Sequence, residues 1–219
     1  MLIACWSAKG GAGTTVVATS LALMLALREA NGALLADFGG DIPAVLGIAE
    51  AESAGLAGWL EAGESVPADA LARLEEAVSP GLRLLPRGEG ELATARGMVL
   101  ASVLERSARP VVADCGNLRA SSTGQAATAV AHAASRCLLV IRPCYLSLRH
   151  ALSAPIRPTA AVVVRQPGRS LGRGDVERVL EVPVVAQVED DPAVARAVDA
   201  GLLAGRLPRS MERGLRDVA

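Results

Sequence analysis

The stretch Ser7-Ala8-Lys9-Gly10-Gly11-Ala12-Gly13-Thr14-Thr15 (SAKGGAGTT) decides the interpretation of this chain. It follows a short apolar run over residues 1–7 (MLIACWS), which predicts a buried strand. In residues 14–28, which follow it, apolar side chains recur at helical spacing, and Asn31-Gly32 predicts where that helix ends. The sequence therefore predicts a strand, a glycine-rich turn and a helix in direct succession.

A glycine-rich turn at the start of a helix is suited to bind an anion. Gly10, Gly11 and Gly13 let backbone N–H groups converge, and the helix N-terminus adds the positive end of its dipole. The hydroxyl of Thr15, in the first turn of the expected helix, is placed to reach a Mg²⁺ ion. The pattern thus indicates a loop that binds phosphate groups.

Lys9 is the only lysine of the chain, since 21 of its 22 basic residues are arginines. An ammonium is a compact charge and fits where a planar guanidinium does not. Because the one lysine lies among the glycines of the loop, we interpret it as a functional residue and not as a surface charge.

The composition limits the classes of protein to consider. With 219 residues, 51% of them hydrophobic and 21% charged, the chain can bury a full core. The net charge of −1 argues against a strongly cationic nucleic-acid binder. Four cysteines without CxxC spacing predict buried reduced thiols, not a metal site or disulfides. Without an apolar run of about 18 residues or a signal peptide, we expect a cytoplasmic protein.

Short apolar runs alternate with helical patterns along the rest of the chain. Further strands are expected at residues 33–37, 82–85, 110–114, 137–141, 160–164 and 184–188. Helices are expected in short pieces over 42–74, then at 91–106, 125–134, 146–152, 175–180, 192–203 and, less regularly, 207–219. This order predicts an α/β fold: one P-loop domain over residues 1–219, with a mostly parallel twisted sheet of about seven or eight strands and helices on both faces. Ligands of such sheets bind where the strands end.

The loop resembles the deviant Walker A motif KGGxGK[ST] of the ParA/MinD family of P-loop proteins (SIMIBI class). Other segments resemble further family motifs in the same order: residues 33–37 the second acidic motif, 111–114 Walker B, 137–148 (CLLVIRPCYLSL) the segment hhhhxxPxxxSL, and 184–198 the closing strand, proline and helix. The resemblance covers nearly all of the chain, and it implies a protein that binds ATP and Mg²⁺.

The resemblance also implies roles for single residues of the loop. The nucleotide-binding residues would be Lys9, Gly10, Gly11, Ala12, Gly13, Thr14 and Thr15. Lys9 matches the family lysine that reaches across a sandwich homodimer to the nucleotide of the partner subunit, and it is therefore a candidate catalytic residue. Thr14 stands where the family has a second lysine, which contacts the β and γ phosphates. Its loss is expected to cost roughly 1.5–3 kcal/mol of binding free energy.

Two acidic residues complete the expected site. Asp114 ends a buried strand and is expected to reach Mg²⁺ through water. Asp37 matches the first carboxylate of the family's DxD motif and is a candidate catalytic residue, but Gly39 replaces the second. Asp41 is expected to cap a helix that begins at Ile42. Because positioning and charge stabilisation carry phosphoryl transfer, Thr14 and Gly39 predict slow or absent hydrolysis.

The base of the nucleotide has three further candidate ligands. Arg165 lies where relatives commonly have an asparagine; it could stack on the base or be solvated. Asp191 and Pro192 match a loop that lies against adenine in relatives, while Pro192 is equally explained as the first residue of a helix.

Thr14, a residue other than lysine before Thr15, makes the loop similar to that of the CpaE/TadZ branch of the family. Members of this branch localise and help assemble the Tad (Flp) pilus secretion machinery. Two alternatives remain open: a ParA/MinD-type positioning ATPase for chromosomes, plasmids or the division site, and a non-hydrolysing scaffold. All imply a homodimer through the P-loop face, protein partners, and recruitment to the membrane or cell pole by them. DNA or membrane binding would involve arginines at 157–173 or 206–216, for which a solvated face is the simpler explanation. The apolar face of residues 207–215 is expected to dock on the protein's own core.

Overall fold

The computed structural model describes residues 1–49, 53–63, 67–93, 95–119 and 125–219. Its strands are β1 (Leu2–Ser7), β2 (Ala33–Asp37), β3 (Glu76–Ser79), β4 (Leu82–Leu85), β5 (Val111–Asn117), β6 (Arg136–Ile141), β7 (Ala160–Arg165) and β8 (Val184–Glu189). Its helices are α1 (Thr14–Arg28), α2 (Ile42–Leu46), α3 (Gly55–Glu61), α4 (Gly97–Glu105), α5 (Gln125–Ala133), α6 (Tyr145–Leu152), α7 (Arg173–Leu180), α8 (Pro192–Asp199) and α9 (Arg209–Leu215), with a 3₁₀ helix at Ala68–Leu74.

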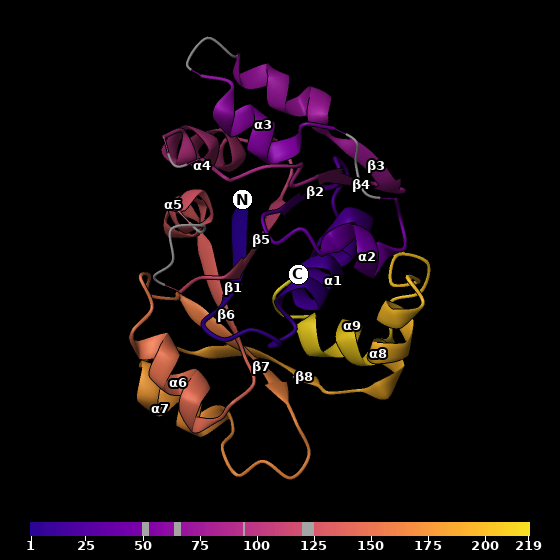
Figure 1. Cartoon of the computed structure of the whole chain (residues 1–219). Helices are drawn as coiled ribbons and strands as arrows, with labels where there is room; N and C mark the ends of the chain where they lie inside the picture. The colour runs from indigo at the N-terminus through magenta and orange to yellow at the C-terminus, as the bar shows by residue number, and fades with distance from the viewer. Residues whose placement is uncertain (50–52, 64–66, 94, 120–124) are drawn as a thin grey trace.

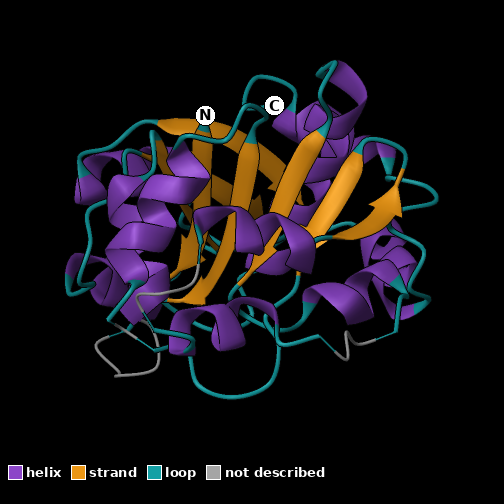
Figure 2. Ribbon diagram, turned by 90° about the horizontal axis from the view of Figure 1, so that it is seen from above, coloured by secondary structure: helices purple, strands orange, loops and turns teal. Residues whose placement is uncertain are grey.

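The strands form one sheet, which Figures 1 and 2 show from two sides. Their order in the sheet is β3-β4-β2-β5-β1-β6-β7-β8. Neighbouring strands run parallel, except that β3 pairs antiparallel with β4. The expected α/β fold with a mostly parallel sheet is therefore confirmed. The strand order reverses its direction at β1, since β5 and β2 lie on one side of it and β6 and β7 on the other. In a parallel sheet, ligands bind at the carboxyl ends of the strands at such a reversal.

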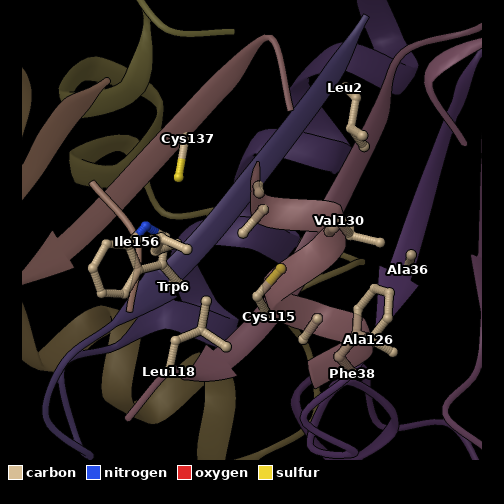
Figure 3. Packing of buried hydrophobic residues seen from close by; sticks show 14 of the residues in the cluster. Leu2, Trp6, Ala36, Phe38, Cys115, Leu118, Ala126, Val130, Cys137 and Ile156 are labelled. Atoms are coloured by element: carbon tan, nitrogen blue, oxygen red, sulfur yellow. The ribbon is translucent and has the colours of Figure 1, made fainter. Parts of the chain in front are cut away.

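Each face of the sheet packs against its own set of helices. Along β1 the side chains alternate: Ile3 and Cys5 belong to the cluster that contains α1, α2 and α9, whereas Leu2, Ala4 and Trp6 belong to the cluster with α3 to α7. This is the two-residue period of a strand that is buried on both faces. Figure 3 shows part of the second cluster, where Trp6 lies among aliphatic side chains and cysteines. All four cysteines are free, and only Cys144 is not fully buried.

Helix α9 docks on the sheet, as the sequence predicts. Met211 and Leu215 are buried in the cluster with α1. A Cβ on Gly214 would lie only 2.6 Å from the carbonyl oxygen of Gln187, so the helix lies directly against β8. The apolar face of this helix is therefore not free to enter a membrane. No helix among the described residues is long and apolar enough to cross one.

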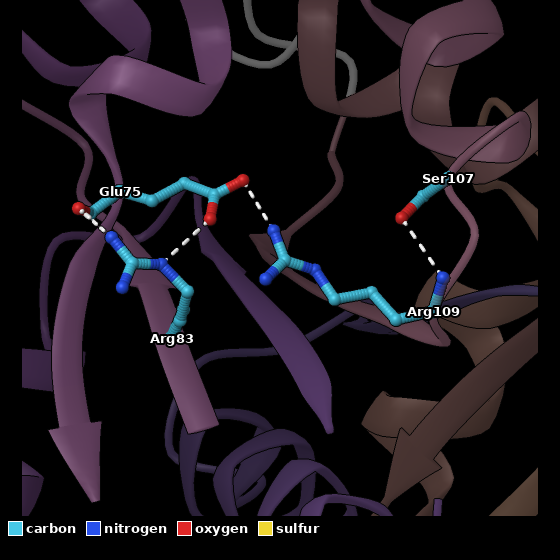
Figure 4. Close-up of polar contacts among 4 residues, drawn as sticks. All are labelled: Glu75, Arg83, Ser107 and Arg109. Atoms are coloured by element: carbon cyan, nitrogen blue, oxygen red, sulfur yellow. Dashed lines mark hydrogen bonds and ion pairs between the residues drawn. The ribbon is translucent and has the colours of Figure 1, made fainter. Parts of the chain in front are cut away.

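The edge strand β3 is absent from the sequence-based prediction. Its residues are only half-buried, so no apolar run marks it. The buried carboxylate of Glu75 stabilises this edge by ion pairs with Arg83 (2.9 Å) and with Arg109 from the loop before β5 (Figure 4). The backbone N–H of Arg109 donates to the hydroxyl of Ser107. Partners so far apart in sequence carry no local signal.

The helix expected at 91–106 is wrong in its first half, because α4 begins only at Gly97. Arg96 precedes that helix and is turned inward. Its guanidinium donates to the carbonyl of Trp59 at 2.8 Å and lies 3.8 Å from the centroid of the Trp59 ring. A buried cation over an aromatic face fixes the start of α4 against α3. The strand expected at 110–114 instead continues to Asn117.

Candidate functional site

The glycine loop joins the carboxyl end of the central strand β1 to the start of α1. Gly11 (φ +73°) and Gly13 (φ +90°) have left-handed backbones, which a side chain would strain. No atom lies within 4 Å of where a Cβ on Gly11 would stand, so the loop borders open space. Gly13 is the N-cap of α1, and its carbonyl accepts the first helical hydrogen bond from Val17 at 3.0 Å. This geometry suits an anion at the helix N-terminus.

Asn117 holds the loop from the neighbouring strand. With its amide oriented by the surrounding hydrogen-bond network, its oxygen accepts from the N–H of Gly10 at 2.9 Å and its nitrogen donates to the carbonyl of Ser7 at 3.3 Å. The sequence shows Asn117 after the expected strand but assigns it no role. Its contact with the loop depends on β1 lying beside β5, which is a property of the topology.

Lys9 lies in the exposed part of the loop. Within the described ranges its ammonium has no ion pair or hydrogen bond. A small cavity of about 30 Å³ separates the loop from the end of β6 and is lined by Lys9, Arg142 and Ser147. Hydrogen bonds with Ser147 are the main cause of a lowered pKa of Cys144 at the start of α6, and the charge of Lys9 contributes. Among the described residues, Lys9 is thus an unpaired cation in a glycine loop whose geometry suits phosphate binding.

Asp37 and Asp114 lie side by side, because the two residues are register partners in the parallel pair of β2 and β5. Alternation along each strand directs both side chains to the face that α1 covers. Both residues are fully buried. Two carboxylates and the N-terminus of α1 therefore meet under the glycine loop.

The carboxylate of Asp37 is occupied by the backbone. Its oxygens accept from the N–H groups of Gly40 (2.6 Å) and Ile42 (3.2 Å). Burial raises the pKa of Asp37, and these N–H groups oppose the rise. Asp37 therefore caps α2. The prediction that Asp41 provides this cap is wrong: Asp41 has the N-cap position, but its side chain is exposed and makes no capping hydrogen bond.

Asp114 is only partly satisfied. Its Oδ1 accepts from the N–H of Gly116 at 3.0 Å, whereas its Oδ2 is buried and has no hydrogen-bond partner among the described residues. Burial raises the pKa of Asp114 to about 6; the hydroxyl of Thr15 lies near enough to oppose this rise, although it forms no hydrogen bond of good geometry with Oδ2, and the charge of Asp37 adds to the rise. A buried acceptor without a partner is costly, so it points to a missing ligand.

This arrangement fits a Mg²⁺ ion. Mg²⁺ prefers oxygen ligands and in nucleotide sites uses one or two protein groups, with phosphate and water supplying the rest. The free Oδ2 of Asp114 and the half-buried Thr15 offer such groups. A Cβ on Gly39 would lie 3.6 Å from that Oδ2 and 3.7 Å from Oδ1 of Asp37, so the glycine leaves the space above both carboxylates open. The described residues contain no cluster of three or more His, Cys, Asp or Glu that could bind a metal by itself.

A second cavity, of about 240 Å³, adjoins the start of α1. Its lining combines apolar side chains with a few polar groups, which is typical of a small-molecule site. The lining includes Gly13, Val17, Arg142, Val164, Val188, Asp190, Asp191 and Val194. Arg142 and Asp190 form an ion pair across it at 3.4 Å. No local pattern in the sequence marks these two residues, because they follow different strands and meet only where β6, β7 and β8 end.

Of the three residues expected at the base, only Asp191 lines this cavity. Its carboxylate caps α8 by accepting from the N–H of Ala193 at 2.8 Å. Pro192 is exposed and occupies the first turn of α8, in agreement with its alternative explanation as the first residue of a helix. Arg165 pairs with Glu189 at 3.3 Å on the surface and borders a different cavity.

No protein-family model and no curated protein sequence matches the chain. Solved structures do. A ParA family ATPase from Chlorobium tepidum has a TM-score of 0.77 at 18% identity, over 99% of this chain and 96% of that one. The septum site-determining protein MinD from Pyrococcus horikoshii, complexed with Mg-ADP, has a TM-score of 0.76 at 18% identity, over 99% and 93%. A Cyanothece McdA–ATP complex has 0.70 at 17%, over 99% and 95%. The chain therefore has the fold of the ParA and MinD ATPases.

Proposed function

We propose that this chain is a ParA/MinD-type protein that binds ATP together with Mg²⁺ at the ends of β1, β2 and β5. The observation that carries this proposal is the buried Oδ2 of Asp114, which lies beneath an open glycine loop and has no hydrogen-bond partner in the part of the chain that the structure describes. Structures of the same fold that contain Mg-ADP or ATP support the choice of ligand. The chain's deviant Walker A sequence supports it independently.

Different segments of the chain would bind different parts of the nucleotide. The backbone of residues 10–15 would hold the phosphates, and Thr15 with Asp114 would hold the Mg²⁺, which neutralises phosphate charge when bound. The nucleoside would occupy the 240 Å³ cavity beside Gly13, between Arg142 and Asp191. The apolar walls of that cavity suit a base, and its polar groups suit a ribose.

We further propose that the protein is a homodimer with weak or no ATP hydrolysis. Lys9 is exposed and has no ion pair in the described part of the chain, so it is available to the nucleotide of a second copy. Thr14 supplies no charge to the β and γ phosphates, and Gly39 supplies no second carboxylate. Catalysis of phosphoryl transfer depends on such groups.

The cellular role that we propose is localisation and assembly, resembling CpaE/TadZ of the Tad pilus machinery, with recruitment by protein partners. The alternative is a ParA/MinD-type positioning ATPase, which the neighbouring structures favour, among them a MinC:MinD complex from Aquifex aeolicus. The third possible role is that of a scaffold that does not hydrolyse ATP. Membrane binding through α9 has little support, since Met211 and Leu215 are buried.

Calorimetry with ATP, with and without Mg²⁺, tests the binding proposal. We expect binding that requires Mg²⁺ and that Asp114→Asn weakens. Light-scattering mass with ATP and Mg²⁺ tests the dimer, which Lys9→Ala should weaken while Arg169→Ala, an exposed matched control, does not. Phosphate release should be slow for the purified protein. No ATP binding at millimolar concentration would overturn the proposal, and rapid release would overturn its hydrolysis part alone.

A further inference from the structure

Helices α8 and α9, with the turn between them, enclose a groove of about 860 Å³ beside the edge strand β8. Figure 1 shows the two helices next to each other near the C-terminus. The groove shares only Asp191 with the cavity proposed above for the nucleoside. Four arginines line it: Arg196, Arg206, Arg209 and Arg213.

These arginines are exposed, and no guanidinium group among them forms a hydrogen bond or ion pair with the described part of the chain. By contrast, Arg142, Arg165 and Arg173 are each paired with a carboxylate. Around one groove, four guanidinium groups without a hydrogen-bond partner among the described residues form a concentrated site for carboxylates, which arginine binds with two parallel hydrogen bonds.

The two acidic residues of the lining, Asp191 and Glu212, offset only part of the charge of the four arginines. The oxygens of Asp191 are already in use, because its carboxylate accepts from Ser210 Oγ at 2.7 Å and from the N–H of Ala193. The hydroxyl of Ser210 is the main cause of its lowered pKa, and the charges of Arg196 and Arg213 contribute. Glu212, the second acidic residue of the lining, is exposed to solvent. The groove therefore keeps an excess of positive charge.

The groove also has an apolar floor. Leu202 is 59% exposed in it, although it is a large aliphatic side chain. Ala193, Ala197, Leu207 and Pro208 add further apolar surface. Exposed aliphatic surface bordered by arginines is typical of a protein–protein interface, where arginine is enriched and apolar contacts supply affinity.

We propose that this groove binds an acidic segment of a protein partner, with apolar side chains of the segment on Leu202 and its carboxylates on the surrounding arginines. DNA fits less well, because phosphates would use the arginines but leave the apolar floor exposed. The proposal does not depend on nucleotide binding.

A peptide selection followed by binding measurements tests this. Random 12-residue peptides displayed on phage are selected on the full chain, and one selected peptide is labelled for fluorescence anisotropy. We expect peptides rich in Asp and Glu with two or more Leu, Ile or Phe. The double variant Arg206→Ser/Arg209→Ser should bind at least about tenfold more weakly. The matched control Arg157→Ser/Arg169→Ser, which also removes two exposed arginines, should bind like the natural chain. Leu202→Ser should weaken binding several-fold without a change of charge.

Circular dichroism and thermal melting confirm that each variant is folded. The same chain is then titrated with a 20-base-pair DNA duplex and with vesicles of phosphatidylglycerol and phosphatidylcholine, and its mass is measured by light scattering. Selected peptides without acidic bias, or equal binding by both double variants, would overturn the proposal. Tighter binding of DNA, vesicles or a second copy through Arg206 and Arg209 would also overturn it.

Discussion

Asp114 provides the most direct test of the site, because its charge is predicted to destabilise the folded chain. Its pKa is raised from 3.8 to about 6, with burial as the largest cause. Between these values the folded state binds the proton and the unfolded state does not. The free energy of unfolding therefore falls on this account as the pH rises from about 4 to about 6, by about 3 kcal/mol in total.

The substitution Asp114→Asn removes this charge while keeping the shape of the side chain. At about pH 7.5 we expect the variant to be more stable than the natural chain by about 2 kcal/mol, since the new amide loses about 1 kcal/mol of the gain by lacking a full set of partners. Near pH 4.5 the advantage should vanish, because the natural carboxyl is then protonated in the folded state. Urea denaturation followed by circular dichroism at both pH values gives the two free energies.

Asp217→Asn, an exposed carboxylate of the same type, serves as the control and should show no such change with pH. A second arm adds ATP and Mg²⁺, which should raise the melting temperature of the natural chain more than that of Asp114→Asn. If Asp114→Asn is less stable than the natural chain at both pH values, or if the difference is independent of pH, the carboxylate is not a destabilised ligand awaiting a cation and the reasoning fails.

Three further substitutions address other parts of the site. Asp37→Ala should lower the free energy of unfolding by about 2 kcal/mol in urea denaturation, because two backbone N–H groups lose their acceptor; unchanged stability would contradict the capping role. Thr14→Lys should tighten ATP binding about tenfold in calorimetry by restoring a charge beside the phosphates; an unaltered affinity would mean that position 14 does not reach them. Ser210→Ala should raise the pKa of Asp191 in an NMR titration, since the hydroxyl contributes most to its lowered value; the absence of a shift would refute that contact.

Much of the sheet could be predicted because its strands are buried on both faces. The strand expected at 33–37 has the bounds of β2, and that at 160–164 lacks only the last residue of β7. A strand that is buried on both faces forms a nearly continuous apolar run, so it can be recognised from the sequence alone. The half-buried β3 has no such pattern, and its stabilising partners Arg83 and Arg109 come from other elements. An edge strand of this kind is not visible to local reasoning.

The site was predictable where a motif is continuous and not where it depends on strand order. The loop and Asp114 follow from local patterns, because glycines before a helix and an acidic strand end have direct physical meanings. The contact of Asn117 with Gly10 and the ion pair between Arg142 and Asp190 do not. Each joins segments that become neighbours only because β1 lies between β5 and β6, and β7 between β6 and β8.

Burial raises the pKa of both neighbouring carboxylates, but the two differ in their hydrogen bonds, and this difference bears on turnover. Both oxygens of Asp37 accept backbone hydrogen bonds that begin α2, and these bonds offset part of the cost of its burial. Asp114 keeps one buried oxygen without a hydrogen-bond partner among the described residues, which a bound cation would satisfy. For Asp37 to orient a water molecule, it would have to give up hydrogen bonds that hold α2 in place. The capping role of Asp37 is therefore a reason, independent of Thr14 and Gly39, to expect a protein that binds ATP and hydrolyses it slowly.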